Sequence, residues 1–167
     1  MLRDSPCYVI AEIGSNYNQS LHRAFELIEK AAAAGADAVK FQLFRANTLY
    51  HPRAGPVYDL IKKNEMPLGW VRLLALRAQR HGVDFLCTAF DESLVEIVDP
   101  YVPAHKVASS EITHEPLLRH IGSKGKPVML STGGSTWEEV DKAIELLARS
   151  GAPKVVFLQC SLSYPAS

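Results

Sequence analysis

The sequence predicts an α/β fold in which parallel strands alternate with helices. Short apolar runs alternate with amphipathic stretches along the whole chain, which is the pattern of a parallel sheet covered by helices. A polar residue lies in or just after each apolar run, and these residues are Glu12, Lys40, Thr88, Lys106, Ser131 and Tyr164. A doubly wound sheet gathers its ligand site at one switch point, whereas a barrel uses the carboxyl end of every strand. We therefore favour a fold of the (β/α)8 TIM-barrel type, truncated after strand six because 167 residues fall short of the roughly 250 of a closed barrel.

Each element follows from its local pattern. The strands are predicted at residues 8–13, 38–44, 83–88, 105–108, 127–131 and 154–159. Apolar residues at helical spacing predict helices over residues 21–32, 67–78, 93–99, 116–121 and 135–150. Capping-box spacing at Ser93 with Glu96, and at Ser135 with Glu138, marks two helix starts. The long connection 45–66 is predicted to be a functional loop.

Composition and charge exclude several classes of partner. Eighteen basic residues balance 18 acidic ones, so nothing indicates binding to nucleic acid or to an anionic membrane surface. No apolar run is long enough to cross a bilayer, and no signal peptide can be recognised. The widely spaced Cys7, Cys87 and Cys160 suggest no disulfide framework, and the last two are expected to be buried structural thiols in strands. We expect a cytoplasmic protein.

Five blocks of the sequence resemble one family. They are AEIGSNYNQSL (residues 11–21), AGADAVKFQ (34–42), HKVASSE (105–111), GKPVMLSTGGST (125–136) and SYP (163–165). Together they closely resemble the sialic acid synthases, or N-acetylneuraminate synthases, whose relatives include the spore-coat polysaccharide, legionaminate and pseudaminate synthases. The resemblance implies that residues 1–167 are the N-terminal part of the barrel, with the C-terminal barrel strands and an antifreeze-like domain absent.

The resemblance also implies a reaction. The full-length protein is expected to be a transferase that condenses phosphoenolpyruvate with an acetamido sugar aldehyde resembling N-acetylmannosamine. The products would be a nonulosonic (sialic-type) acid and phosphate. Phosphoenolpyruvate carries several negative charges on a small frame, so its site needs cations and hydroxyl donors that converge from different strands. Lysines and hydroxyls at neighbouring strand ends agree with that requirement.

The matched positions assign roles to particular residues. Those implied to bind phosphoenolpyruvate are Lys40, Thr88, Lys106, Ser109 and Ser131. Those implied to be catalytic are Glu12 and Glu111, and those implied to bind the sugar are Asn16, Gln42 and Tyr164. Plainer roles stay open: Glu12 can pair with a lysine, Glu111 can be an exposed loop acid, and Asn16 can be a turn residue after Gly14.

A metal ion and two rival functions complete the expectations. The resemblance implies a divalent metal, Mn2+ or Mg2+, held by two histidines on strands that this chain does not contain, and a homodimer for the full-length protein. His105, His114 and His120 are not spaced as metal ligands and are expected on the rim or on helices. One rival is a Schiff-base aldolase with Lys40 or Lys106 as nucleophile. The other is a non-catalytic phosphosugar-binding or assembly module, and it is open whether the 167-residue chain alone is active.

Overall fold

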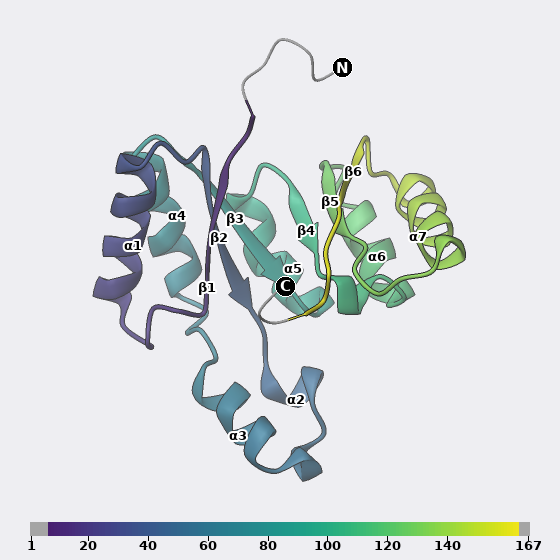
Figure 1. The fold of residues 1–167 in the computed structure, drawn as a ribbon, viewed down its shortest axis with the longest axis horizontal. Coiled ribbons are helices and arrows are strands. Elements are labelled where there is room, and N and C mark those ends of the chain that lie inside the picture. The colour runs from purple at the N-terminus through teal and green to yellow at the C-terminus, as the bar shows by residue number, and fades with distance from the viewer. Residues whose placement is uncertain (1–6, 164–167) are drawn as a thin grey trace.

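The computed structural model describes residues 7–163 as parallel strands covered by helices (Figure 1). The strands are β1 (Ile10–Gly14), β2 (Ala38–Leu43), β3 (Asp84–Ala89), β4 (His105–Val107), β5 (Val128–Ser131) and β6 (Val155–Leu158). The helices are α1 (Leu21–Ala33), α2 (Ala46–Leu49), α3 (Pro56–Lys63), α4 (Trp70–Arg80), α5 (Glu92–Val98), α6 (Glu115–Gly122) and α7 (Trp137–Ser150). The predicted α/β fold with parallel strands is confirmed. Within the described residues, no helix combines the length and the hydropathy needed to cross a membrane.

The strands form two parallel sheets that lie next to each other. Their orders are β1-β2-β3 and β4-β5-β6, and β3 neighbours β4. All carboxyl ends therefore point toward the same side of the molecule, where β2 leads into α2 in Figure 1. Between residues 7 and 163, β1 and β6 each have a strand neighbour along one edge. A closed eight-stranded barrel and a truncation after strand six stay predictions.

One side of the strands packs against the helices. Strand residues such as Val39, Phe41 and Leu130 are fully buried there, against helix residues such as Ile28 and Leu147. Burying a side chain of this size contributes about 1.5–3 kcal/mol, so this apolar layer supplies most of the driving force for the fold. Because successive strand residues point to opposite faces, the remaining strand residues face inward, away from the helices.

The connection between β2 and α4 differs from the predicted loop. It contains α2, a 3-10 turn at Pro52–Ala54 and α3, and it projects from the carboxyl ends of the strands in Figure 1. The Glu65 carboxylate accepts a hydrogen bond of 2.7 Å from the backbone N–H of Ala46 and closes the segment on itself. Thr48 Oγ1 donates to Asp91 and ties α2 to the start of α5. No residue of α3 is buried, although Val57, Leu60 and Ile61 lie at helical spacing in its sequence.

Helices α5 and α7 begin at other residues than the two predicted capping boxes. The N-cap of α5 is Asp91 rather than Ser93, since the Asp91 carboxylate accepts from the backbone N–H of Leu94 at 2.9 Å. The box at α7 consists of Thr136 and Glu139, one residue after the predicted pair. The Asp91 carboxylate and the Thr136 hydroxyl, close to the expected serines, can accept hydrogen bonds from the free N–H groups of a helix start equally well.

Helices α6 and α7 approach closely at Gly122. A Cβ atom on this glycine would lie 2.6 Å from Ser150 Cβ and 3.0 Å from the carbonyl oxygen of Leu147. Neither atom is at the end of a flexible side chain, so the two helices would have to separate to admit a methyl group.

We therefore expect Gly122→Ala to lower the free energy of unfolding by about 1–3 kcal/mol, the usual cost of overpacking. Gly69→Ala is the matched control, because a Cβ at Gly69 meets no atom within 4 Å. Urea denaturation of both variants measures the difference. Equal stability of the two variants would contradict the close packing of α6 on α7.

A buried polar cluster joins the segment after α5 to β4 and β5. His105 Nε2 donates to the Asp99 carboxylate at 3.0 Å, and Lys126 Nζ lies 3.2 Å from the same carboxylate oxygen. Lys126 also donates to the carbonyl of Val102 at 3.0 Å. Although burial raises the pKa of Asp99, the hydrogen bonds from His105 and Lys126 outweigh it and hold that pKa below its usual range. His105 is 2% exposed, so the expectation that it lies on the rim was wrong.

This cluster should make the protein less stable in weak acid. Burial is the main reason why the pKa of His105 is lowered, against the opposing effect of Asp99. The unfolded chain therefore binds more protons, and stability is lost as the pH falls below the ordinary histidine pKa of about 6.5. We expect the urea midpoint to drop between about pH 7.5 and about pH 5.5, and His105→Gln to reduce that drop. His22→Gln, at a side chain that is 85% exposed, should leave the drop unchanged.

Candidate functional site

The inner face of the first sheet carries the polar residues of β1, β2 and β3. In the ladder Glu12 is paired with Lys40, and Gln42 with Thr88. Side chains of paired residues in a parallel ladder lie on the same face, as do residues two apart in one strand. The sequence-predicted Glu12, Lys40, Gln42 and Thr88 therefore come together on one surface.

Lys40 forms an ion pair with Glu12 at this face. The lysine side chain is 10% exposed and the Glu12 side chain is 47% exposed, so the pair runs from the interior to the mouth of the site. Gly14 leaves room for the carboxylate: a Cβ there would lie 3.2 Å from Glu12 Oε1, and the glycine has a positive φ of 58°. The same Cβ position is 4.0 Å from Asn16 Nδ2, which places Asn16 beside Glu12.

The inner face of the second sheet carries Lys106 and Ser131. Lys106 is paired with Met129, which precedes Ser131 by two residues in β5. Ser131 is 2% exposed. Ser109 follows β4, and its Oγ accepts a hydrogen bond of 3.1 Å from the backbone N–H of Gly133. Because the Ser109 oxygen is the acceptor in this bond, its hydroxyl can still donate a hydrogen bond to a ligand.

The two lysines face each other across the site. Burial, together with the nearby charge of Lys40, lowers the pKa of Lys106 to about 8, although Cys160 and Glu12 oppose the shift. In the described part of the chain, Glu12 pairs with Lys40 and Lys106 has no carboxylate within ion-pair distance. The site therefore holds more positive than negative charge.

Thr88 supplies a hydroxyl with no partner. Thr88 is 1% exposed, and its Oγ1 makes no hydrogen bond in the structure. A buried hydroxyl that lacks a partner costs stability, typically about 1–3 kcal/mol, and such groups call for an explanation. An excess of ammonium groups beside free hydroxyl donors can hold a small multivalent anion.

Other predicted site residues are placed differently. The Glu111 side chain is 14% exposed, so it is not an exposed loop acid. Its carboxylate lies 3.4 Å from His114 Nδ1 and makes its ionic contact with that histidine. Asn16 donates from Nδ2 to the carbonyl of Ile13 at 3.1 Å, which is the turn role that had been left open. Tyr164 lies outside the described residues.

Two further residues lie at the site although no site role was predicted for them. Gly133 acts through its backbone N–H, and a Cβ there would lie 3.0 Å from Cys160 Cβ, so the loops after β5 and β6 meet at this glycine. Cys160 follows β6, is partly exposed and lies near Lys106, which corrects its expected place in a buried strand. Cys87 is buried as expected, and burial raises the pKa of its thiol to about 12, so it is no nucleophile.

The described residues do not fit a metal site. Between residues 7 and 163, no three side chains of His, Cys, Asp or Glu lie close enough together to hold an ion. The carboxylates of Glu12 and Glu111 are each engaged by a basic side chain. The divalent metal that the sequence resemblance implies therefore has no ligand set in this part of the chain.

Comparison with known proteins places the chain among one group of relatives. The sequence profile of the NeuB family matches residues 27–167. The chain is 35% identical to the spore coat polysaccharide biosynthesis protein SpsE of Bacillus subtilis, over 98% of the chain and 47% of that protein. It is 36% identical to the N,N'-diacetyllegionaminic acid synthase of Legionella pneumophila, over 96% of the chain and 50% of the synthase.

A solved structure agrees in fold. The N-acetylneuraminic acid synthetase of Leptospira borgpetersenii, crystallised with citrate, superposes with a TM-score of 0.92 at 29% identity, covering 98% of this chain and 57% of that one. The chain spans about half the length of the curated relatives it matches. The family profile, however, covers most of the chain. The protein therefore belongs to the NeuB family.

Proposed function

We propose that this chain forms the phosphoenolpyruvate-binding part of a nonulosonic acid synthase. The observation that carries the proposal is the inner face of the described strands, on which Lys40 is ion-paired with Glu12 and the buried Lys106 has no carboxylate within ion-pair distance. Buried positive charge without a partner is costly, and a trianionic ligand of small size would offset that cost. The names of the relatives, which include a legionaminic acid synthase, support the same reaction class.

The proposed reaction joins phosphoenolpyruvate to an acetamido sugar aldehyde. C3 of phosphoenolpyruvate forms a bond to the aldehyde carbon, and the aldehyde oxygen takes up a proton and becomes a hydroxyl. Water adds to C2 and gives up one proton, which balances the proton taken up by the aldehyde oxygen. The C2–O bond to phosphate then breaks, the leaving phosphate carries away the second proton, and C2 becomes a ketone. The atoms balance as phosphoenolpyruvate, aldehyde and water giving a 2-keto acid and inorganic phosphate.

The described residues would act by holding charge and moving a proton. Lys40 and Lys106 would bind the carboxylate and phosphate groups, with Thr88, Ser109 and Ser131 donating hydrogen bonds. Glu12 at the mouth would pass a proton between the attacking water and the new hydroxyl. Asn16 and Gln42 would contact the sugar beside it.

One observation favours a second candidate, the Schiff-base aldolase. Lys106 has a pKa of about 8, so part of it is neutral near physiological pH and able to attack a carbonyl. Borohydride reduction in the presence of pyruvate separates the two functions. An aldolase would gain the mass of a reduced pyruvyl adduct on Lys106, whereas the synthase reaction forms no imine and predicts no adduct.

Phosphorus NMR tests the proposed function directly. The chain is mixed with phosphoenolpyruvate, Mg2+ and N-acetylmannosamine, and the mixture is repeated with a chelator. A shifted or broadened phosphoenolpyruvate signal is the expected result. Sugar-dependent release of phosphate would show that the chain turns over by itself, and binding without release would favour a non-catalytic module. An unperturbed signal would rule out the assigned site.

Removing the Lys106 ammonium should weaken phosphoenolpyruvate binding strongly. A hydrogen bond to a charged group contributes about 1.5–3 kcal/mol, so Lys106→Met should raise Kd by about ten- to a hundredfold. Because the ammonium form binds the anion, affinity should also fall as the pH rises through about 8, and the variant should lose this dependence. Titration calorimetry measures both effects. Lys142→Met, at a lysine that is 70% exposed, is the control and should bind normally.

The Thr88 hydroxyl should matter for binding and not for folding. Thr88→Val removes a buried hydroxyl that has no partner, so the urea midpoint should stay the same or rise. Kd for phosphoenolpyruvate should increase about five- to tenfold, while Thr88→Ser should keep most of the affinity. A Thr88→Val protein that is less stable yet binds normally would contradict the assignment.

A further inference from the structure

Strand β4, which carries Lys106, has few backbone contacts to hold it. It is three residues long, whereas strands usually have about five or six. In the described part of the chain its ladder partner is β5 alone, although β3 lies beside it. The backbone N–H of His105 donates to the carbonyl of Pro127 at 2.9 Å. So short a strand needs further contacts to fix where Lys106 lies.

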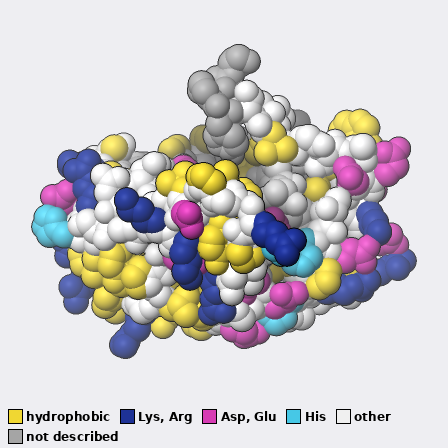
Figure 2. Space-filling model, turned by 90° about the horizontal axis from the view of Figure 1, so that it is seen from below, with side chains coloured by type: hydrophobic (Ala, Val, Ile, Leu, Met, Phe, Trp, Pro, Cys, Tyr) yellow, Lys and Arg dark blue, Asp and Glu magenta, His cyan; other side chains and the backbone are white. Residues whose placement is uncertain are grey.

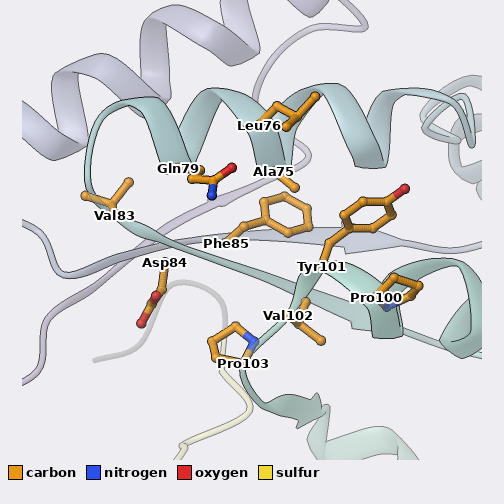
Figure 3. Close-up of a pocket in the computed structure, with 10 residues that line it drawn as sticks. All are labelled: Ala75, Leu76, Gln79, Val83, Asp84, Phe85, Pro100, Tyr101, Val102 and Pro103. Atoms are coloured by element: carbon orange, nitrogen blue, oxygen red, sulfur yellow. The ribbon is translucent and has the colours of Figure 1, made fainter.

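The segment that leads into β4 is open on one side. Residues 100–103 line a hollow of about 400 Å³ that also borders α4 and the start of β3. Figure 3 shows Val102 and Pro103 across this hollow from Ala75 and Gln79 of α4. Apolar packing on this side therefore holds the segment only loosely, because an open hollow leaves the atoms that line it without partners.

The buried polar cluster of Asp99, His105 and Lys126 supplies the missing support. Lys126, which precedes β5, donates to the backbone carbonyls of Asp99 and Val102. The Asp99 carboxylate lies 3.2 Å from Lys126 Nζ and accepts from His105 Nε2 at 3.0 Å. His105 is the first residue of β4, and its side chain lies on the face opposite to that of Lys106. The cluster therefore ties the first residue of β4 to the preceding segment and to the start of β5.

We infer that this cluster positions Lys106 in the anion site, so that its three members are positioning residues for the proposed reaction. Neighbouring Cα atoms are joined by a planar peptide and lie about 3.8 Å apart, so a shift of His105 carries Lys106 with it. A displacement of about 1 Å is enough to weaken a charged contact with a ligand strongly. The inference rests on the proposed function only in naming phosphoenolpyruvate as the anion. The environment of Lys106 can be measured without any ligand.

Acetic anhydride labelling across a range of pH measures where Lys106 titrates, because only the neutral amine reacts. Mass spectrometry of the peptides separates Lys106 from the Lys and Arg side chains that Figure 2 shows at the surface. Lys142, whose side chain is 70% exposed, is the internal reference. In the unchanged chain we expect a midpoint at about pH 8. His105→Leu fills the space but cannot donate to Asp99, so Lys106 should gain solvent and its midpoint should rise by about one pH unit.

Two variants separate positioning from lost stability. His105→Gln keeps an amide that can donate to the Asp99 carboxylate, so it should retain the midpoint of the unchanged chain. Gly122→Ala disturbs the packing of α6 on α7, far from the cluster in sequence and contacts, and should also leave the midpoint unchanged. Asp99→Asn keeps the shape of the side chain and removes its charge. It should raise the midpoint as His105→Leu does, and it replaces that variant if His105→Leu does not fold.

The other charged and titratable groups around Lys106 stay the same in every variant. They are Glu12 of β1, Lys40 of β2 and Cys160 after β6. A change in the midpoint therefore reports the placement of Lys106 and not a change in its charged neighbours.

Titration calorimetry with phosphoenolpyruvate gives the second readout. At about pH 7 the ammonium form of Lys106 prevails in all variants, so Kd reports where the group lies. His105→Leu should raise Kd by about five- to tenfold, while His105→Gln and Gly122→Ala should bind like the unchanged chain.

Two results would overturn the inference. One is a midpoint and a Kd that neither His105→Leu nor Asp99→Asn changes. The other is a Gly122→Ala protein in which both quantities move as far as in His105→Leu. If the midpoint of Lys106 responds as expected but the unchanged chain does not bind phosphoenolpyruvate, the proposed function fails and the positioning of Lys106 stands.

Discussion

In the described part of the chain, two ammonium groups lie on the inner face of the strands with one ion-paired carboxylate, and the proposed anion site depends on this imbalance. The helix-facing side of the strands is filled by apolar side chains, so the polar groups of each strand can only face inward. Lys40 is held there by Glu12, whereas Lys106 responds to burial with a lowered pKa. A bound anion would remove the imbalance, so ligand binding should also stabilise the folded chain.

The strands and helices that follow from a regular apolar spacing could be predicted from the sequence. The helix caps could not, because adjacent side chains compete for the same backbone N–H groups. The strands and main helices follow from apolar spacing that a parallel α/β packing requires. The caps at Asp91 and Thr136 were misplaced by one or two residues because adjacent side chains offer equivalent oxygens. Helix α3 was missed because Pro52, Gly55 and Pro56 indicate a loop, although Val57, Leu60 and Ile61 just after them lie at helical spacing.

For the site, residue type was enough to find Lys40 and Lys106, since a lysine in an apolar run needs a reason. Contributions that depend on the backbone or on distant partners could not be seen in the sequence. Gly133 donates a backbone N–H to Ser109, and Gly14 leaves space for Glu12. The burial of His105 rests on its pairing with Asp99 and, through that carboxylate, on Lys126 from a later element.

The candidate anion site depends on packing from the far side of the same layer. Helix α4 packs its buried residues against β3, and β3 carries Thr88 on its inner face. A large-to-small substitution among the buried residues of α4 would therefore loosen the strand that holds Thr88, and it should lower both the free energy of unfolding and the affinity for an anion. Thr88→Val, in contrast, removes the hydroxyl and leaves this packing in place, so it separates the direct contact of the site from the support behind it.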